Sequence, residues 1–307
     1  MIVMRIAVTG SSGLIGTALT TSLLRDGHEV IRLVRRDPRS GPRPDGSTEA
    51  RWDPRRQWVD LAALDGVEAI AHLAGAGVGD RRWSEAYKRE IRDSRVLGTC
   101  AIAEAAAALE PRPRVLASGS AIGYYGDTGD RPVDETHPPG EGFLAQVCQD
   151  WEEATRPAEE AGVRTVHLRT GLVVSRSGGA WGRLFPIFRA GLGGRLGSGR
   201  QFWSYISMAD EIAAIRHVMF SAELHGPVNL TAPEPVTNRE VTAAMGEVLR
   251  RPTLLAVPAP ALRLALGDFA DDVLGSQRVR PRALLESGFR FRHTDVRDAI
   301  RAALADG

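Results

Sequence analysis

The chain has 307 residues, of which 25% are charged, and its formal net charge is +1. This length is large for one small core, so we expect one large α/β domain with an appended lobe. The near-balance of charge gives no reason to expect a nucleic-acid partner. Lys88 is the sole lysine, which excludes Schiff-base chemistry elsewhere, and the G-K-[ST] sequence of a P-loop is absent.

The cysteines and the hydropathy pattern indicate the cellular environment. Cys100 and Cys148 are the only cysteines, and each lies in an apolar stretch with a helical pattern. We therefore expect buried free thiols rather than a disulfide, and no metal site. No basic N-terminal region precedes an apolar run, and no window approaches the ~20 apolar residues of a membrane span. These features predict a soluble cytoplasmic protein without a membrane partner.

A strand, a glycine-rich turn and a helix open the chain. Apolar residues from position 6 to 8 lead into glycines at 10, 13 and 16, and apolar residues at helical spacing follow. In such a turn the first glycine allows reversal, the second allows a pyrophosphate to approach, and the third allows close packing of the helix on the sheet. The helix N-terminus favours an anion. The alternative is a turn with a helix cap alone. The predicted dinucleotide-binding residues are Gly10, Ser11, Ser12, Gly13, Leu14, Ile15 and Gly16.

The residues that follow the second predicted strand, at 29–34, indicate which nicotinamide cofactor to expect. Together with the first strand and helix, this strand forms a right-handed βαβ unit. In NAD-binding units an acidic side chain near the end of this strand binds the ribose hydroxyls. Here Arg35 and Arg36 follow the strand, and no carboxylate stands there to repel a 2′-phosphate. We therefore predict NADP(H) rather than NAD(H). The alternative is a solvated arginine pair on a loop.

Residues 37–53 are rich in proline and glycine and predict a loop around one short strand at 50–52. Asp53 ends that strand. Its carboxylate is a candidate acceptor for the adenine amino group, although an aspartate before a proline is as often a turn former.

A buried strand at 68–73 continues the sheet. Leu73, Ala74 and Gly75 end it and leave room for the cofactor to pass. His72 fits a core position better than a catalytic one. A helix at 83–109 follows, from which Arg95 is a candidate cofactor contact.

A strand beginning at residues 114–117 leads into S-G-S-A-I-G-Y-Y-G at 118–126, and here a resemblance becomes specific. This motif, the HLAG strand end, Glu135 and G-F-L-A at 142–145 resemble the extended short-chain dehydrogenase/reductase superfamily, the branch of the nucleotide-sugar epimerases. F-L-A-Q-V-C-Q-D-W-E at 143–152 and P-R-A-L-L-E-S-G-F-R-F at 281–291 resemble its "epimerase family" subgroup, which carries a C-terminal domain of unknown function.

The chain departs from this superfamily at the catalytic pair. Superfamily enzymes use a tyrosine and a lysine four residues apart, with the lysine lowering the tyrosine pKa. Phe143 and Val147 stand at these positions, and no Y-x-x-x-K occurs in the chain. The resemblance leaves Ser120 as first catalytic candidate, with Tyr124 or Tyr125 as a different proton donor. Structural packing is the alternative role for either tyrosine.

The rest of the chain predicts a helix at 143–161, a strand at 163–170, a helix at 208–222, a strand at 226–230 and a capping box before a helix at 238–249. By resemblance, the backbone of Val173 lies near the nicotinamide. Arg200, Gln201 and Trp203 either line a substrate cleft or fill the junction between lobes. We expect a dinucleotide-binding domain at 1–175, joined again by 206–231, and a smaller lobe at 176–205 and 232–307.

The sequence thus predicts an α/β fold: a Rossmann-type doubly wound parallel sheet with a smaller C-terminal α+β substrate lobe. The resemblance implies an NADP(H)-binding oxidoreductase or epimerase acting on a small polar or carbohydrate-like substrate, and a homodimer formed through two long helices. The alternatives are a non-catalytic NADP(H)-binding sensor or scaffold and a nucleotide-sugar binding module. Fold analogy does not choose among them.

Overall fold

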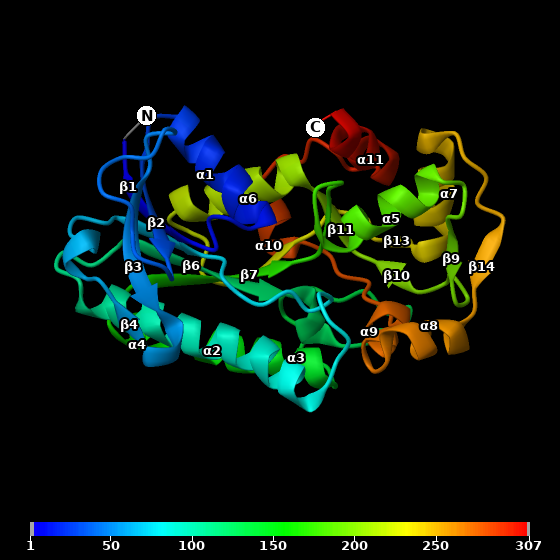
Figure 1. Cartoon of the computed structure of the whole chain (residues 1–307), viewed down its shortest axis with the longest axis horizontal. Helices are drawn as coiled ribbons and strands as arrows, with labels where there is room; N and C mark the ends of the chain where they lie inside the picture. Colours follow the sequence, from blue (N-terminus) through cyan, green and yellow to red (C-terminus); the bar gives the residue numbers. More distant parts are fainter. Residues whose placement is uncertain (1–2, 306–307) are drawn as a thin grey trace.

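An eight-stranded sheet forms the centre of the computed structural model, which describes residues 3–305 (Figure 1). Its strand order is β12-β7-β6-β5-β1-β2-β3-β4, and every neighbouring pair is parallel except β3 and β4. The order reverses beside β1, which creates the crevice where doubly wound sheets bind ligands. The strands are β1 (Arg5–Thr9), β2 (Glu29–Val34), β3 (Thr48–Asp53), β4 (Trp58–Val59), β5 (Ala69–His72), β6 (Val115–Ala121), β7 (Arg164–Thr170) and β12 (Gly226–Leu230).

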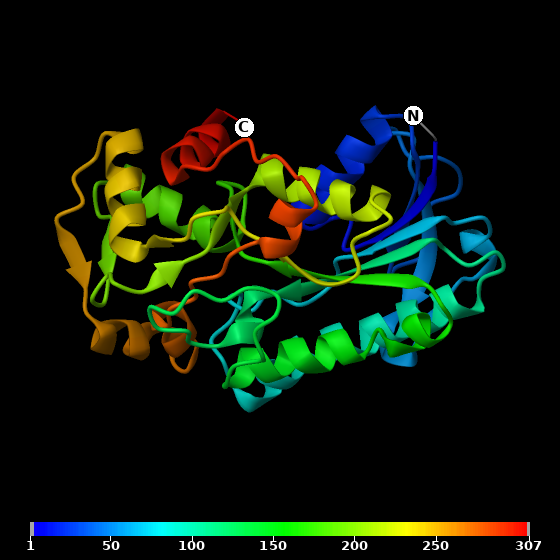
Figure 2. The same ribbon diagram turned by 180° about the vertical axis from the view of Figure 1, so that it is seen from behind.

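Helices cover both faces of this sheet, as the apolar strands require. Figures 1 and 2 show α1 and α6 on one side of the sheet and α2 with α3 and α4 on the other. Leu19 of α1 and Ile215 of α6 are buried in the apolar core on one face of the sheet. Ile102 of α2 is buried in the apolar core on the other face. The helices are α1 (Leu14–Arg25), α2 (Glu85–Ala108), α3 (Phe143–Glu153), α4 (Arg156–Glu160) and α6 (Met208–Phe220).

The smaller lobe has its own core around the wholly buried Trp181 and Tyr205. Parallel pairing of β8 with β11 lies at its junction with the main sheet. The helices and strands at this end are β8 (Leu172–Val174), α5 (Gly179–Arg189), β9 (Gly194–Leu196), β10 (Phe202–Trp203), β11 (Tyr205–Ser207), β13 (Val236–Thr237), α7 (Asn238–Leu249), β14 (Leu255–Val257), α8 (Ala259–Leu266), α9 (Phe269–Leu274) and α11 (Val296–Ala305). Short 3₁₀ turns are η1 (Pro54–Arg56), η2 (Ala62–Leu64) and η3 (Ile122–Tyr125).

The doubly wound sheet and the capping box at Thr237 and Glu240 agree with the sequence predictions. The helix expected at 143–161 is instead two helices, because Pro157 lacks an N–H group and its ring clashes with the carbonyl four residues earlier. The strand β3 is longer than the expected strand at 50–52, and β6 begins within the predicted range and continues to Ala121.

One segment of the C-terminal part leaves the small lobe. Residues 281–291 return to the main sheet, where α10 (Arg282–Glu286) lies beside β12, whereas α11 packs in the core of the small lobe. Leu284 is fully buried in the same core as Val228 of β12. The expected lobe at 232–307 is therefore interrupted, because Leu284, Phe289 and Phe291 find their apolar partners under α6.

Both cysteines are free; Cys148 is buried, whereas Cys100 is only half-buried. No helix within residues 3–305 is long and apolar enough to cross a membrane. The same residues contain no group of three or more His, Cys, Asp or Glu side chains that could hold a metal ion.

Candidate functional site

The glycine turn after β1 brings bare backbone to the carboxyl end of the sheet. Gly10 has a φ of +63°, and a Cβ there would lie 2.7 Å from the Leu73 carbonyl. A Cβ on Gly16 would lie 2.2 Å from the Gly10 oxygen, so Gly16 allows the helix to pack on the turn rather than on the sheet. A Cβ on Gly13 would meet only the Gly10 oxygen, at 3.2 Å. Gly13 therefore leaves open space on the solvent side, as a pyrophosphate requires.

The start of α1 favours an anion at this turn. Gly13 is its N-cap, no side chain caps it, and no acidic residue occupies its first turn. The unpaired N–H groups and the helix dipole therefore keep their positive charge. Ser12 is exposed, whereas Ser11 is buried. Leu14 and Ile15 are half-buried in the first turn of the helix.

A cleft of about 1080 Å³ opens beside this turn. It runs across the carboxyl ends of β1, β2, β3 and β5 to the N-terminal half of α2. Of the predicted site residues it contains Gly10, Ser11, Ser12, Gly13, Arg35, Arg36, Leu73, Ala74 and Gly75. Those outside its lining are Leu14, Ile15, Gly16, Asp53, Arg95, Ser120, Tyr124 and Val173.

Thr9 and His72 hold the cleft loop at 73–75. The Thr9 hydroxyl accepts hydrogen bonds from the N–H groups of Leu73 and Ala74, at 3.0 and 3.2 Å. Its proton is then donated to Nδ1 of His72, 2.8 Å away. Burial lowers the pKa of His72 to about 3, so the imidazole is neutral. His72 is a core residue, as its sequence context predicted.

Arg95 supports the same loop from α2. Its Nη1 donates to the Ala76 carbonyl at 2.9 Å and to the Ile91 carbonyl at 3.0 Å. Its guanidinium lies 4.9 Å from the centre of the Trp151 ring. These contacts make Arg95 a positioning residue for the loop, and its predicted contact with the cofactor stays a prediction.

Arginines gather where β2 and β3 end. Arg36 binds both carboxylate oxygens of Glu49, at 2.8 and 2.6 Å, and Arg43 also binds Glu49. Arg32 donates to Asp45 at 2.6 Å and to the Ser11 carbonyl at 3.0 Å. The sequence alone did not predict these contacts, because each arginine and its carboxylate partner are separated by loop residues and no local motif pairs them. Of the charged cleft residues near these strand ends, Arg32, Arg43, Glu49 and Arg55 were found only in the structure.

Asp53 acts as a turn former in this structure. Its Oδ1 accepts hydrogen bonds from the N–H groups of Arg55 and Arg56, at 3.0 and 3.2 Å, and so caps η1. These hydrogen bonds fit the alternative role of Asp53, that of a turn former before a proline. Its contact with adenine remains a prediction.

Ser120 lies in a buried polar network at the end of β6. Its hydroxyl donates to Oε1 of Glu152 at 2.6 Å. Arg169 binds both oxygens of Glu152, through Nε and Nη2, each at 2.8 Å. A carboxylate held in this bidentate way is ionised and accepts hydrogen bonds only. The proton of Ser120 is therefore committed to Glu152, which leaves the serine oxygen as an acceptor.

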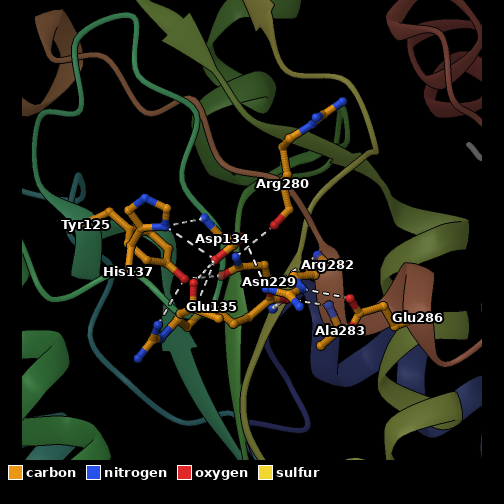
Figure 3. Close-up of polar contacts among 11 residues, drawn as sticks. Tyr125, Asp134, Glu135, His137, Asn229, Arg280, Arg282, Ala283 and Glu286 are labelled. Carbon is orange, nitrogen blue, oxygen red and sulfur yellow. Dashed lines mark hydrogen bonds and ion pairs between the residues drawn. The ribbon is translucent and has the colours of Figure 1, made fainter.

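The network continues to the C-terminal part of the chain, as Figure 3 shows for its outer half. Nη1 of Arg169 donates to the Tyr125 hydroxyl at 2.9 Å, which in turn donates to Oδ1 of Asn229 at 2.8 Å. Glu135 accepts from the N–H groups of Asn229 and Ala283, at 2.9 and 3.2 Å. Burial raises the pKa of Tyr125 to about 12. Tyr125 therefore serves structure rather than proton transfer.

Tyr124 differs from its neighbour. It is half-buried, and the Arg169 guanidinium lies 3.4 Å from the centre of its ring. Its hydroxyl makes no hydrogen bond to any other residue in the described part of the chain, so its proton is uncommitted. Tyr124 therefore has the more available proton of the two catalytic candidates, and the catalytic role of either residue stays a prediction.

Phe143 and Val147, at the positions of the superfamily pair, belong to an apolar cluster. The Phe143 ring packs edge-on against Trp83 with centres 5.0 Å apart, and Val147 is buried beside them. The Lys88 ammonium lies 5.9 Å from the centre of the Phe143 ring and pairs with Asp268 at 2.6 Å. Val173 lies in β8 with a buried side chain, and its proximity to the nicotinamide stays a prediction.

Comparison with known proteins places this geometry in context. Residues 6–230 match the NAD dependent epimerase/dehydratase family, and residues 257–303 match a domain of unknown function (DUF1731). Epimerase family protein MT2273 of Mycobacterium tuberculosis is 47% identical over 296 residues, which cover 96% of each chain. The crystal structure of human epimerase family protein SDR39U1 with NADPH has a TM-score of 0.88 and 30% identity, and the match covers 99% of this chain and 100% of that one. A nucleoside-diphosphate sugar epimerase structure from Corynebacterium glutamicum has a TM-score of 0.79 and 36% identity, with coverage of 99% and 58%. This chain therefore spans little more than half the length of that protein.

Proposed function

The chain belongs to the NAD dependent epimerase/dehydratase family, and we propose that within it this protein binds NADP(H) in the cleft beside the glycine turn. The observation that carries the proposal is the pairing of an open glycine turn with arginines at the ends of β2 and β3. The human relative whose structure is described with NADPH supports the choice of cofactor.

The cleft residues fit a dinucleotide phosphate. The bare backbone at Gly13 and the uncapped start of α1 suit the pyrophosphate, while Arg35 suits the 2′-phosphate. When bound, NADPH supplies a hydride. Tyr124 holds the available proton, and Ser120 offers a lone pair to a substrate hydroxyl or N–H group. We propose an oxidoreductase or epimerase acting on a small polar or carbohydrate-like substrate, without a tyrosine–lysine pair.

Titration of the purified protein with NADPH and NADH tests the cofactor assignment. We expect NADPH to bind at least about tenfold more tightly, which corresponds to about 1.4 kcal/mol. Arg35→Ala should remove most of that preference, because its guanidinium has no competing carboxylate. Equal affinities in the wild type, or an unchanged preference in the variant, would contradict the assignment.

A second candidate function is a non-catalytic NADP(H)-binding sensor or scaffold, and the committed proton of Ser120 favours it. General acid–base help contributes typically about 10²–10⁴-fold to a rate, so its loss slows a reaction without abolishing it. NADPH consumption with panels of small carbonyl compounds separates the two functions. If turnover is found, Tyr124→Phe should reduce it more than it weakens NADPH binding. Tight NADPH binding with complete recovery of unchanged NADPH would favour the sensor.

A further inference from the structure

The strand-end wall of the cleft contains five arginines, but their charges are not equally available. The five are Arg32, Arg35, Arg36, Arg43 and Arg55. Three of them are bound to carboxylates, because Arg32 pairs with Asp45 while Arg36 and Arg43 share Glu49. A guanidinium whose N–H groups already serve a carboxylate must lose those bonds before it can bind a phosphate in the same way.

Glu49 is the centre of the larger of these clusters. Its side chain is completely covered, and it accepts a further hydrogen bond from the N–H group of Arg39 at 2.9 Å. The Arg36 hydrogen bond holds the pKa of Glu49 down at about 2, so the carboxylate stays ionised. Glu49 lies in β3, and its carboxylate binds the Arg36 guanidinium across the loop that joins β2 to β3. Arg36, a candidate from sequence, is therefore committed to the fold.

Arg35 and Arg55 are exposed, and neither forms an ion pair or side-chain hydrogen bond with any residue between 3 and 305. Arg35 follows β2 and Arg55 follows β3, and these strands are adjacent and parallel. In this pairing Val34 lies opposite Arg51, so Arg55 stands about three residues, or roughly 10 Å of extended chain, beyond the position level with Arg35, on a strand about 4.8 Å away. The Asp53 cap fixes the backbone of η1 at Arg55 without using its guanidinium. The two unpaired guanidinium groups, each on a long side chain, thus line the same cleft at the carboxyl edge of the sheet.

We propose that Arg55 is a specificity-determining residue, which binds the 2′-phosphate of NADP(H) together with Arg35, and that Glu49 keeps Arg36 out of this contact. This inference rests on the proposed binding of NADP(H). Two guanidinium groups from adjacent strands grip the phosphate from two sides. NADH carries no 2′-phosphate, so removal of Arg55 affects NADPH binding alone.

The chain offers a matched control for this contact. Arg56 is the next residue of the same 3₁₀ turn, and the same Asp53 oxygen caps its N–H group, yet it does not line the cleft. Arg55→Ala and Arg56→Ala therefore remove the same charge from the same turn. Binding of NADPH and of NADH to both variants and to Arg36→Gln is measured by fluorescence titration. Circular dichroism confirms that each variant is folded.

We expect Arg55→Ala to weaken NADPH binding about tenfold, as loss of one charged contact does, with NADH binding unchanged. Arg56→Ala and Arg36→Gln should change the ratio of the two affinities less than about threefold. Equal effects of Arg55→Ala and Arg56→Ala would overturn the inference, as would equal loss of NADPH and NADH binding. Collapse of the preference in Arg36→Gln would overturn the role given to Glu49.

One further unpaired arginine in the cleft, Arg89, lies on α2 rather than at a strand end. Arg89→Ala should leave the preference for NADPH intact. If it removes that preference while Arg55→Ala does not, the 2′-phosphate lies toward α2 and the inference is wrong. Failure of the wild type to bind either nucleotide contradicts the proposed function itself, which separates the two failures.

Discussion

The buried carboxyl group of Glu211 should make the stability of this protein fall as the pH rises. Glu211 lies in the first turn of α6 with no exposed surface. Its Oε1 accepts a hydrogen bond from the Thr170 hydroxyl at 3.0 Å. Its Oε2 finds no partner among the described residues. Burial raises the pKa of Glu211 from 4.5 to about 8, against the opposing effect of the Thr170 hydrogen bond.

The sign of the effect follows from where the proton is bound. Below pH 4.5 the carboxyl is protonated in both the folded and the unfolded chain, so it contributes no pH dependence. Between pH 4.5 and about 8 the folded protein keeps the proton while the unfolded chain has lost it. Each rise of one pH unit in this window lowers the free energy of unfolding by about 1.4 kcal/mol. The accumulated loss between pH 4.5 and pH 7 is therefore about 3 kcal/mol. Total stabilities are typically about 5–15 kcal/mol, so this effect is measurable.

Glu211→Gln removes the titration and keeps a carbonyl oxygen for the Thr170 hydroxyl. We expect the difference in unfolding free energy between variant and wild type to grow by about 3 kcal/mol from pH 5 to pH 7.5, in favour of the variant. Urea unfolding at both pH values measures this difference. Glu223→Gln, at an exposed position, is the control and should show no such change. If Glu211→Gln has the same pH dependence as the wild type, the burial argument is wrong.

Three other features lead to measurable outcomes. Gly13→Val should abolish NADPH binding while the far-UV circular dichroism stays native, since the added side chain would occupy the space proposed for the pyrophosphate and its Cβ meets only one backbone oxygen of the fold. Phe143→Tyr alone should give a phenol whose pKa is lowered by the nearby Lys88 ammonium, as ultraviolet titration would measure. Adding Val147→Lys should lower the melting temperature, because Val147 is buried and the new ammonium group would lose its hydration. The outer faces of α2 and α3 show no large exposed hydrophobic side chain in residues 3–305, so light scattering should report the mass of one chain rather than the homodimer that the resemblance implies.

Local patterns in the sequence were enough to predict the glycine turn and the main sheet. The turn depends on backbone freedom at Gly10, and the capping box depends on two side chains three residues apart. The position of Arg35 in the cleft was predictable for the same reason, because it immediately follows a strand, whereas its contact with a 2′-phosphate stays a prediction. His72 was recognisable as a core residue from its apolar strand.

The missed features depend on partners that are distant in the sequence. Ser120 loses its free proton to Glu152, 32 residues later, and Glu152 is held by Arg169 from a third element. The Arg36 guanidinium binds Glu49 across a proline-rich loop and is therefore not available to a phosphate. A side chain's identity shows what it can bond, but only the fold decides which partner reaches it first. A motif therefore names candidate residues without showing whether their protons or charges are available.

The loss of the tyrosine–lysine pair and the commitment of Ser120 have one structural origin in α3. At Phe143 and Val147 this helix presents apolar side chains, which pack with Trp83 and join α3 to α2. One to two turns further on, the same helix supplies Glu152, which takes the proton of Ser120. Arg169 then neutralises Glu152, so this buried pair brings no net charge to the end of β6. The helix that supplies the proton shuttle in superfamily enzymes therefore provides packing and a closed ion pair in this chain, and any proton for hydride chemistry must come from outside α3.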